Sequence, residues 1–187
     1  MKIEINRTVK ALKNGKIILY PTDTVWGIGC DATNAEAVEK IYKLKHRCNN
    51  KSMIILVDTV ERIARHVKRI PKIAHDFIEL SEMPVTIIYP RAKNLAENLI
   101  AEDGTIAVRI VNHEFCRKLI SVFDCPIVST SANITGINPP MSFDEISPDV
   151  INNVDFIVNR EYEETPTKKP SAIIRLGFKN EIEVLRK

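Results

Sequence analysis

The stretch 41-IYKLKHRCNNKSMIILV-57 predicts the end of a helix, a basic loop and a buried strand. The helix begins at Asn34, a suitable N-cap residue, and its apolar side chains recur at helical spacing as far as Leu44. Residues 53–57 form a short, wholly apolar run, which is typical of a strand covered on both faces. The loop between them carries Lys45, Arg47 and Lys51, so it is a candidate anion-binding segment.

The directions in which the Lys45 and Arg47 side chains point depend on the conformation of the backbone. In a continuing helix, Lys45 and Arg47 would lie about 200° apart around the axis and would diverge. In an extended chain, residues two apart face the same side, and Lys51 would be near enough to join them. The sequence leaves both alternatives open.

Two further apolar segments are followed by small hydrogen-bonding side chains with a period of two. Residues 17–20 precede Thr22 and Thr24, and residues 126–128 precede Ser129, Ser131 and Asn133. Strand ends in open α/β sheets commonly bind ligands. The alternative is that these residues only bond their own backbone in turns. Taken with the basic loop, they favour one crevice with a cationic wall and two hydroxyl-rich walls.

Arg109 stands in the middle of an apolar strand predicted at residues 105–111. A buried arginine is costly unless an anion meets it, so Arg109 is a candidate ligand-binding residue, with a structural carboxylate partner as the alternative. Alternation along the strand places Thr105 on the same face.

The remaining pattern predicts an α/β fold with a twisted mixed sheet and flanking helices, because helices and strands alternate without a strict βαβ rhythm. Residues 1–187 are expected to form one domain. Residues 21–29 are expected to be irregular, and Trp26 is expected in the core, with stacking on a base as the alternative. We expect helices at 4–13, 34–44, 60–67, 70–80 and 113–122, and strands at 17–20, 53–57, 84–89, 105–111, 127–128, 156–158, 172–176 and 182–185.

Composition and the absence of certain motifs restrict the classes of function that this chain can have. The 27 basic and 24 acidic residues leave a net charge of +3, which allows an anionic ligand or RNA without requiring either. The four cysteines lack zinc-type spacing, and no long apolar run is present, so we expect reduced thiols in a cytoplasmic protein that does not enter a membrane. Phosphate-binding glycine motifs and a paired serine nucleophile are absent. Catalysis by positioning and charge neutralisation, as in nucleotidyl transfer, fits these residues best.

The ordered set of motifs resembles the YrdC/TsaC family of threonylcarbamoyl-AMP synthases. The resemblance rests on the segments YPTDTVWGIG (20–29), Lys45-x-Arg47, TIAVR (105–109), STSAN (129–133), Pro170-Ser171 and Arg186. It implies a YrdC-like sheet with a basic concave face. It also implies a nucleotidyltransferase that converts L-threonine, bicarbonate and ATP into threonylcarbamoyl-AMP and pyrophosphate, for modification of adenosine 37 in tRNA.

The resemblance also implies residue roles. Lys45 and Arg47 would be catalytic. The threonine site would contain Thr24, Arg109, Ser129 and Ser171, and the nucleotide site Lys45, Arg47, Lys51, Thr105, Ser131, Asn133 and Arg186. Mg²⁺ would arrive on the ATP phosphates, with no metal site on the protein itself. Partner proteins that transfer the threonylcarbamoyl group are expected. The resemblance leaves open whether the chain also contacts tRNA or double-stranded RNA directly.

Four residues depart from the family pattern at or near the site, namely Trp26, Cys48, Leu56 and Ala172. Two alternative functions remain open from the sequence. One is a non-catalytic RNA-binding module that uses the basic concave face. The other is a carbamoyl-transfer domain of the kind found within much larger chains.

Overall fold

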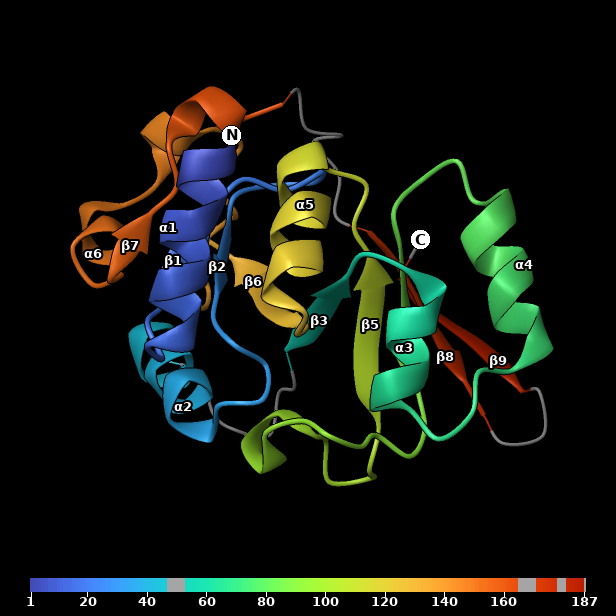
Figure 1. Cartoon of the computed structure of the whole chain (residues 1–187). Coiled ribbons are helices and arrows are strands. Elements are labelled where there is room, and N and C mark those ends of the chain that lie inside the picture. Colours follow the sequence, from blue (N-terminus) through green and yellow to red (C-terminus); the bar gives the residue numbers. More distant parts are fainter. Residues whose placement is uncertain (47–52, 165–170, 178–180, 187) are drawn as a thin grey trace.

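A single twisted sheet organises the chain in the computed structural model, which describes residues 1–46, 53–164, 171–177 and 181–186. The sheet has nine strands in the order β7-β1-β2-β6-β3-β5-β4-β8-β9, with parallel and antiparallel pairs (Figure 1). The strands are β1 Ile18–Tyr20, β2 Gly27–Gly29, β3 Ile54–Val57, β4 Val85–Tyr89, β5 Ile106–Ile110, β6 Ile127–Ser131, β7 Phe156–Ile157, β8 Ala172–Leu176 and β9 Ile182–Arg186. The predicted mixed sheet with flanking helices is confirmed.

The helices begin and end close to the positions that their sequence signals predict. They are α1 Lys2–Lys13, α2 Ala35–Leu44, α3 Val60–His66, α4 Lys72–Leu80, α5 Glu114–Phe123 and α6 Pro148–Ile151, with 3-10 turns η1 Glu97–Leu99, η2 Phe143–Glu145 and η3 Arg160–Tyr162. The Asn34 side chain caps α2 by accepting a hydrogen bond from the Ala37 N–H, as its position before the apolar pattern predicts. None of the helices within the described part of the chain is long and apolar enough to cross a membrane.

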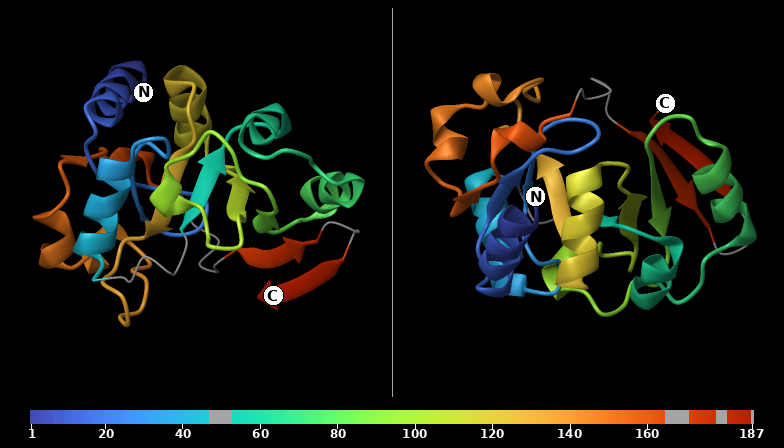
Figure 2. Two further views of the ribbon diagram at one scale, coloured as in Figure 1. Left: turned by 90° about the horizontal axis from the view of Figure 1, so that it is seen from below. Right: turned by 45° about the horizontal axis from the view of Figure 1, so that its top comes forward.

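The two faces of the sheet carry separate apolar clusters. The larger cluster contains Ile55, Val57 and Val108 from the central strands and takes side chains from α2, α3 and α4. The smaller cluster lies on the opposite face, where α1 and α5 pack side by side over β1 and its neighbours (Figures 1 and 2). Burial of these apolar side chains is the main force that holds the helices on the sheet.

The face under α1 and α5 is only partly covered. Leu56 on β3 is fully buried in the α1 and α5 cluster, whereas its register partner Arg109 on β5 faces a cavity. Directly opposed residues of paired strands share one face, so Thr86 on β4 also points to this side. Helical cover therefore ends between β3 and β5, and the uncovered half of the face holds the polar side chains.

Two glycines in β2 allow an aromatic ring to cross the sheet. The Tyr20 ring passes over β2, and its hydroxyl donates a 3.3 Å hydrogen bond to the Val128 carbonyl. A Cβ at Gly29 would lie 2.7 Å from that ring and would also collide with the Val128 carbonyl oxygen. A Cβ at Gly27 would lie 3.3 Å from Ser129 Oγ. Gly29 thus requires a residue without a side chain, whereas a Cβ at Gly27 would be tightly packed against Ser129 and the Tyr20 ring.

Three local predictions were wrong. Residues 21–29 are not irregular throughout, because β2 forms there and pairs with both β1 and β6. Strand β6 does not end at residue 128 but continues through Ser131, so Ser129 and Ser131 lie in the strand. The spacing of two residues between Ser129 and Ser131 therefore reflects the alternation of side chains along a strand. Helix α6, capped by the Ser147 hydroxyl, was also missed because it has only one turn.

Candidate functional site

A cavity of about 280 Å³ lies on the uncovered half of the sheet face. It brings together most of the predicted hydroxyl and arginine residues from five separate segments of the chain. Those that line it are Thr22, Thr24, Arg109, Ser129, Ser131, Ser171 and Arg186. The two hydroxyl-rich segments thus converge with a cationic residue, Arg109, while Arg47 and Lys51 of the predicted basic loop lie outside the described residues.

The Arg109 guanidinium is held from two sides. Its Nη2 lies 3.2 Å from Asp23 Oδ1, and its Nη1 donates a 3.2 Å hydrogen bond to Thr24 Oγ1. Both side chains of the ion pair are buried, with 4% and 7% exposed. The structural carboxylate that the sequence left as an alternative is thus present, but Arg109 still faces the cavity. Its buried Nε has no hydrogen-bond partner among the described residues.

Arg186, on the edge strand β9, lines the same cavity as Arg109 on the interior strand β5. Its Nε donates to the Ser171 carbonyl at 2.9 Å, and the Ser171 hydroxyl lies 2.7 Å from the Thr86 hydroxyl. Partial burial, and then the like charge of Arg109, hold the pKa of Arg186 below its ordinary value. Two guanidinium groups that repel each other across a small cavity would be stabilised by an anion between them.

Lys45 reaches the same region from the other side of β6. Helix α2 ends at Leu44, Lys45 keeps right-handed helical angles, and His46 has a positive φ of 49°. The chain is therefore neither a continued helix nor extended here. Lys45 is buried, and its Nζ donates to the carbonyl oxygens of Ser131 and Asn133 at 2.5 and 2.6 Å. It fixes the backbone of the segment that supplies the hydroxyl groups.

The other predicted nucleotide residues are more widely spread. Asn133 does not line the cavity, and its Nδ2 donates to the carbonyls of Ile134 and Ile137. Thr105 bonds the Asp103 carboxylate at 2.6 Å and lines a separate cavity of about 320 Å³ beside Arg175. Arg47 and Lys51 lie outside the described residues. The assignment of these four residues to ATP stays a prediction.

The residues that depart from the family pattern also differ in position. Trp26 lines the cavity but is only 2% exposed and packs edge-on against Phe143, so its expected place in the core is confirmed. Leu56 is fully buried and does not line the cavity, as already described. Thr22, by contrast, bonds the backbone of Thr24 and Val25, as the turn alternative predicts, while also facing the cavity.

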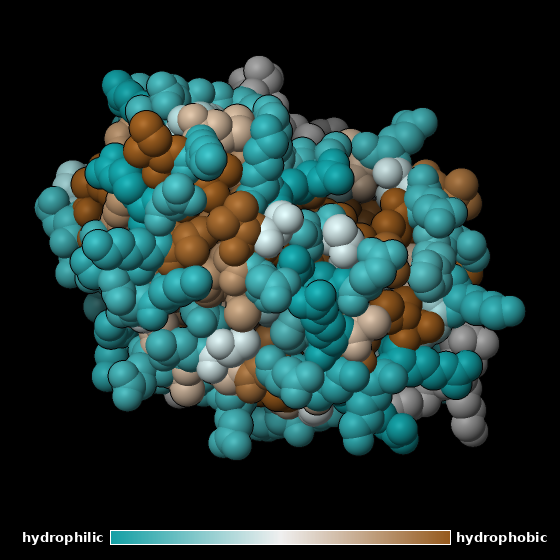
Figure 3. Space-filling view, in the orientation of Figure 1, coloured by the Kyte–Doolittle hydropathy of each residue, from teal (hydrophilic) through white to brown (hydrophobic). Residues whose placement is uncertain are grey.

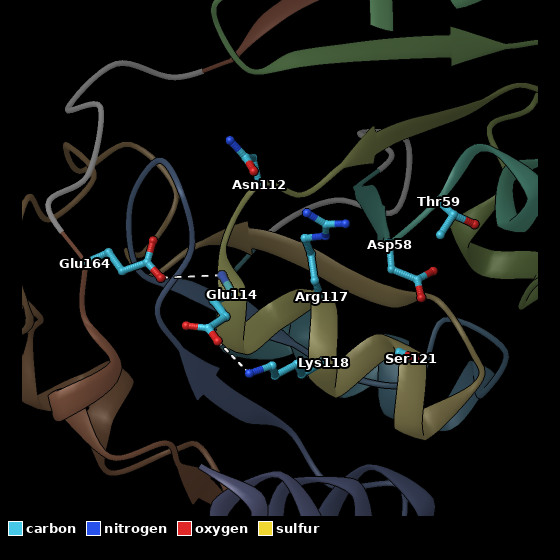
Figure 4. Close-up of a pocket in the computed structure, with 8 residues that line it drawn as sticks. All are labelled: Asp58, Thr59, Asn112, Glu114, Arg117, Lys118, Ser121 and Glu164. Atoms are coloured by element: carbon cyan, nitrogen blue, oxygen red, sulfur yellow. Dashed lines mark hydrogen bonds and ion pairs between the residues drawn. The ribbon is translucent and has the colours of Figure 1, made fainter. Parts of the chain in front are cut away.

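A larger cavity of about 700 Å³ opens beside α5 at the carboxyl ends of β3 and β5 (Figure 4). Figure 4 shows that Lys118 pairs with the Glu114 carboxylate and that the backbone N–H of Glu114 donates to Glu164. A neighbouring cavity of about 440 Å³ shares Asn112 and Arg117 with it and is also lined by Asp23. The buried Asp23–Arg109 pair thus lies between this outer groove and the 280 Å³ cavity.

The basic side chains of α3 are partly neutralised by acidic residues. Arg62 is buried and bonds both carboxylate oxygens of Asp58 as well as Asp124, and Arg65 also pairs with Asp124. Arg62 is thus buried in ion pairs, whereas Arg65 is 58% exposed and only shares Asp124 with it. The face seen in Figure 3 is mainly hydrophilic, with apolar side chains gathered near the α1 and α4 sides.

Sequence reasoning missed two residues of the site, Asp23 and Thr86. Asp23 was visible within the Tyr20–Gly29 motif but had no predicted partner. Thr86 sits in an apolar strand, and only its register position beside Arg109 shows that it faces the cavity side. No group of three His, Cys, Asp or Glu side chains suited to a metal ion occurs among the described residues.

The fold and the cavity define a protein that can bind a small anionic molecule on the half-covered face of a mixed sheet. Comparison with known proteins identifies the family. The profile of the Sua5/YciO/YrdC family, described as telomere recombination, matches residues 10–187. This chain belongs to that family.

Individual relatives agree with this result. Threonylcarbamoyl-AMP synthase of Pseudoalteromonas translucida is 34% identical over 158 residues, covering 83% of this chain and 84% of the relative. The structure of the H234A/Y235A variant of P. abyssi Sua5 superposes with a TM-score of 0.88 at 28% identity, over 97% of this chain and 55% of that one. P. abyssi Sua5 complexed with L-threonine gives a TM-score of 0.84 at 29% identity, over 92% and 50%. This chain therefore spans about half the length of those two solved proteins.

Proposed function

We propose that this chain is a threonylcarbamoyl-AMP synthase, a nucleotidyltransferase that uses L-threonine, bicarbonate and ATP. The observation that carries the proposal is the cavity in which Arg109 and Arg186 face each other among the hydroxyls of Thr24, Ser129 and Ser171. Relatives over most of the chain bear the synthase name, and one solved relative is complexed with L-threonine.

The threonine carboxylate would bind to Arg109. An arginine has five N–H donors, and its contacts with Asp23 and Thr24 engage two of its nitrogens through one donor each. The remaining Nη donors can meet a carboxylate, and such charge-assisted contacts are stronger than neutral ones. The hydroxyls of Ser129 and Ser171 line the same cavity and would orient the rest of the amino acid.

The reaction needs two bond-forming steps. The threonine amine adds to carbon dioxide derived from bicarbonate and loses a proton, which gives a carbamate. A carbamate oxygen then attacks the α-phosphorus of ATP, and the bond to the bridging oxygen breaks so that pyrophosphate leaves. The nucleotide would lie along the segment of Ser131 and Asn133, whose backbone Lys45 fixes, with Arg47, Lys51, Thr105 and Arg186 as further proposed contacts.

ATP would enter as its magnesium complex. The residues around the cavity are arginines and hydroxyls, which suit an anion and not a bare divalent cation. Mg²⁺ would therefore be carried by the phosphates, where it neutralises charge on the leaving group. The product would pass to partner proteins that transfer the threonylcarbamoyl group to tRNA.

The decisive experiment measures pyrophosphate release from ATP with threonine and bicarbonate omitted in turn. We expect release only when both are present, and detection of threonylcarbamoyl-AMP in the same reaction. Release that does not depend on threonine, or that needs serine instead, would contradict the proposed substrate. Nothing in the comparisons favours the RNA-binding alternative, which predicts no turnover and a steep loss of RNA affinity with salt.

A further inference from the structure

Asp23 is the acidic residue most closely associated with the cavity. Its carboxylate makes two contacts with different elements of the fold. Oδ1 lies 3.2 Å from Arg109 Nη2 on β5, and Oδ2 accepts a 3.0 Å hydrogen bond from the Asn112 backbone N–H just beyond that strand. Asp23 is 9% exposed and faces the outer groove, whereas Arg109 faces the 280 Å³ cavity. Asp23 therefore lies behind the guanidinium, on the side away from the cavity.

These contacts determine which donors of Arg109 are available. A guanidinium on a flexible side chain can rotate, and it loses affinity for a ligand if it must be ordered on binding. Asp23 holds one Nη from behind and Thr24 holds the other, so Nε stays buried and unpartnered beside the cavity. The same carboxylate ties the guanidinium to the end of β5, which limits movement of both.

The charges around the cavity also indicate that Asp23 suits this part of the site to an amino-acid carboxylate. Arg109 and Arg186 would place two positive charges against one small cavity, and Asp23 cancels one of them. The net charge of these three side chains is then +1, which one carboxylate on an amino acid would neutralise. Without Asp23, Arg109 would also be attracted to the phosphates of ATP, and the two substrates would be discriminated less well.

We propose that Asp23 is the positioning residue that orients Arg109 toward the amino-acid carboxylate and keeps this part of the site selective for threonine over the nucleotide phosphates. The inference rests on the proposed function. Asp23 touches neither substrate, and it acts through Arg109 alone.

The first test is Asp23→Asn, which keeps an oxygen that can accept from the Asn112 N–H but removes the charge that faces Arg109. We expect the KM for threonine to rise roughly 10- to 100-fold, the range seen when an outer partner of a metal ligand is lost. The KM for ATP should change much less. Asp155→Asn is the matched control, because Asp155 also accepts from a backbone N–H, that of Ile17, but lies away from the cavity. It should keep both KM values.

The second test is the double variant Asp23→Asn with Arg109→Met, compared with Arg109→Met alone. If Asp23 acts only through Arg109, the double variant should have the same KM for threonine as the single one. The double variant removes both charges of the buried pair, so it stays informative even if Asp23→Asn alone fails to fold. Arg109→Met leaves the Asp23 carboxylate unpaired, so circular dichroism is used first to establish that both proteins are folded.

Three results would overturn the inference. They are a folded Asp23→Asn protein with an unchanged KM for threonine, equal increases in the KM values for threonine and ATP, and a double variant clearly worse than Arg109→Met. A wild-type protein without threonine-dependent pyrophosphate release would overturn the proposed function itself, and the inference with it. That outcome is read from the wild-type reaction and is separate from the other three.

Discussion

The hydroxyl of Thr86 on β4 lies 2.7 Å from the hydroxyl of Ser171, which immediately precedes β8. Both side chains are buried, and Thr86 is also the register partner of Arg109 on the neighbouring strand. One threonine thus connects the strand that carries the buried arginine with the residue that Arg186 contacts. The cavity is held together by such lateral hydrogen bonds between strands.

Thr86→Val should weaken threonine binding without changing the shape of the strand. Valine has nearly the same volume but cannot bond Ser171, so we expect a loss of about 1 kcal/mol, or about a fivefold higher KM for threonine. Steady-state kinetics of pyrophosphate release provide the measurement. Thr86→Ser keeps the hydroxyl and should behave like wild type, and equal effects of the two variants would contradict the assigned role of the hydrogen bond.

Gly29→Ala should destabilise the fold by about 3 kcal/mol, because the new Cβ would collide with the Val128 carbonyl and the Tyr20 ring. Urea denaturation gives the free energy of unfolding. Gly104→Ala serves as the comparison, since Gly104 has a φ of +74° but no atom within 4 Å of the added Cβ. It should cost only about 1 kcal/mol, from backbone conformation alone. A Gly29→Ala protein no less stable than Gly104→Ala would refute the proposed collision.

Arg62→Ala should destabilise the protein by about 3 to 5 kcal/mol, because it leaves the buried Asp58 carboxylate without its partner. Arg65→Ala should cost less than about 1 kcal/mol, since Arg65 is 58% exposed and only shares Asp124 with Arg62. Chemical denaturation of both variants tests the difference. Similar losses for the two would show that burial of the Asp58–Arg62 pair has little energetic effect.

His113 should make the protein less stable at mildly acidic pH. Burial lowers the pKa of its imidazole, although the charge of Glu164 acts in the opposite direction. The unfolded chain then binds the proton more tightly, so stability is full above the ordinary pKa of about 6.5 and falls as the pH drops below it. His66 has a pKa lowered by burial as well and should contribute in the same window.

The test compares melting temperatures at pH 7.5 and pH 5.5. His113 caps α5 by accepting from the Cys116 N–H, and asparagine can replace that cap without titrating. His113→Asn should therefore show a smaller drop in melting temperature between the two pH values, while the exposed His75→Asn should match wild type. An unchanged drop in His113→Asn would rule out the proposed contribution of His113.

Much of the fold could be predicted from local patterns. The helical spacing before Leu44, the Asn34 cap and the apolar runs of β3, β4 and β5 each reflect interactions within a few residues, so they were correctly assigned. Strand β2 was missed because Gly-Ile-Gly has no strand propensity of its own. It forms by pairing with β1 on one side and β6 on the other, and its glycines leave room for the Tyr20 ring.

The candidate site, like the fold, could be predicted only in part from the sequence. The residue types that it needs, an arginine in an apolar strand and hydroxyl groups at a period of two, are visible in the sequence, as is the family to which their order belongs. The partners of those residues are not visible. Asp23 and Arg109 are 86 residues apart, and Thr86 and Ser171 are 85 apart. Lys45 is 86 residues from Ser131 and 88 from Asn133, whose carbonyl oxygens it contacts.

The sequence by itself determined which segments become helices and strands and which side chains are available for anion chemistry, because both depend on residue type and short-range spacing. Only the tertiary structure decided that Arg109 is neutralised from behind by Asp23, that Lys45 points to carbonyl oxygens, and that helical cover stops between Leu56 and Arg109. These features depend on the register of neighbouring strands and on where α1 and α5 pack, and long-range packing of this kind leaves no periodic signal along the chain.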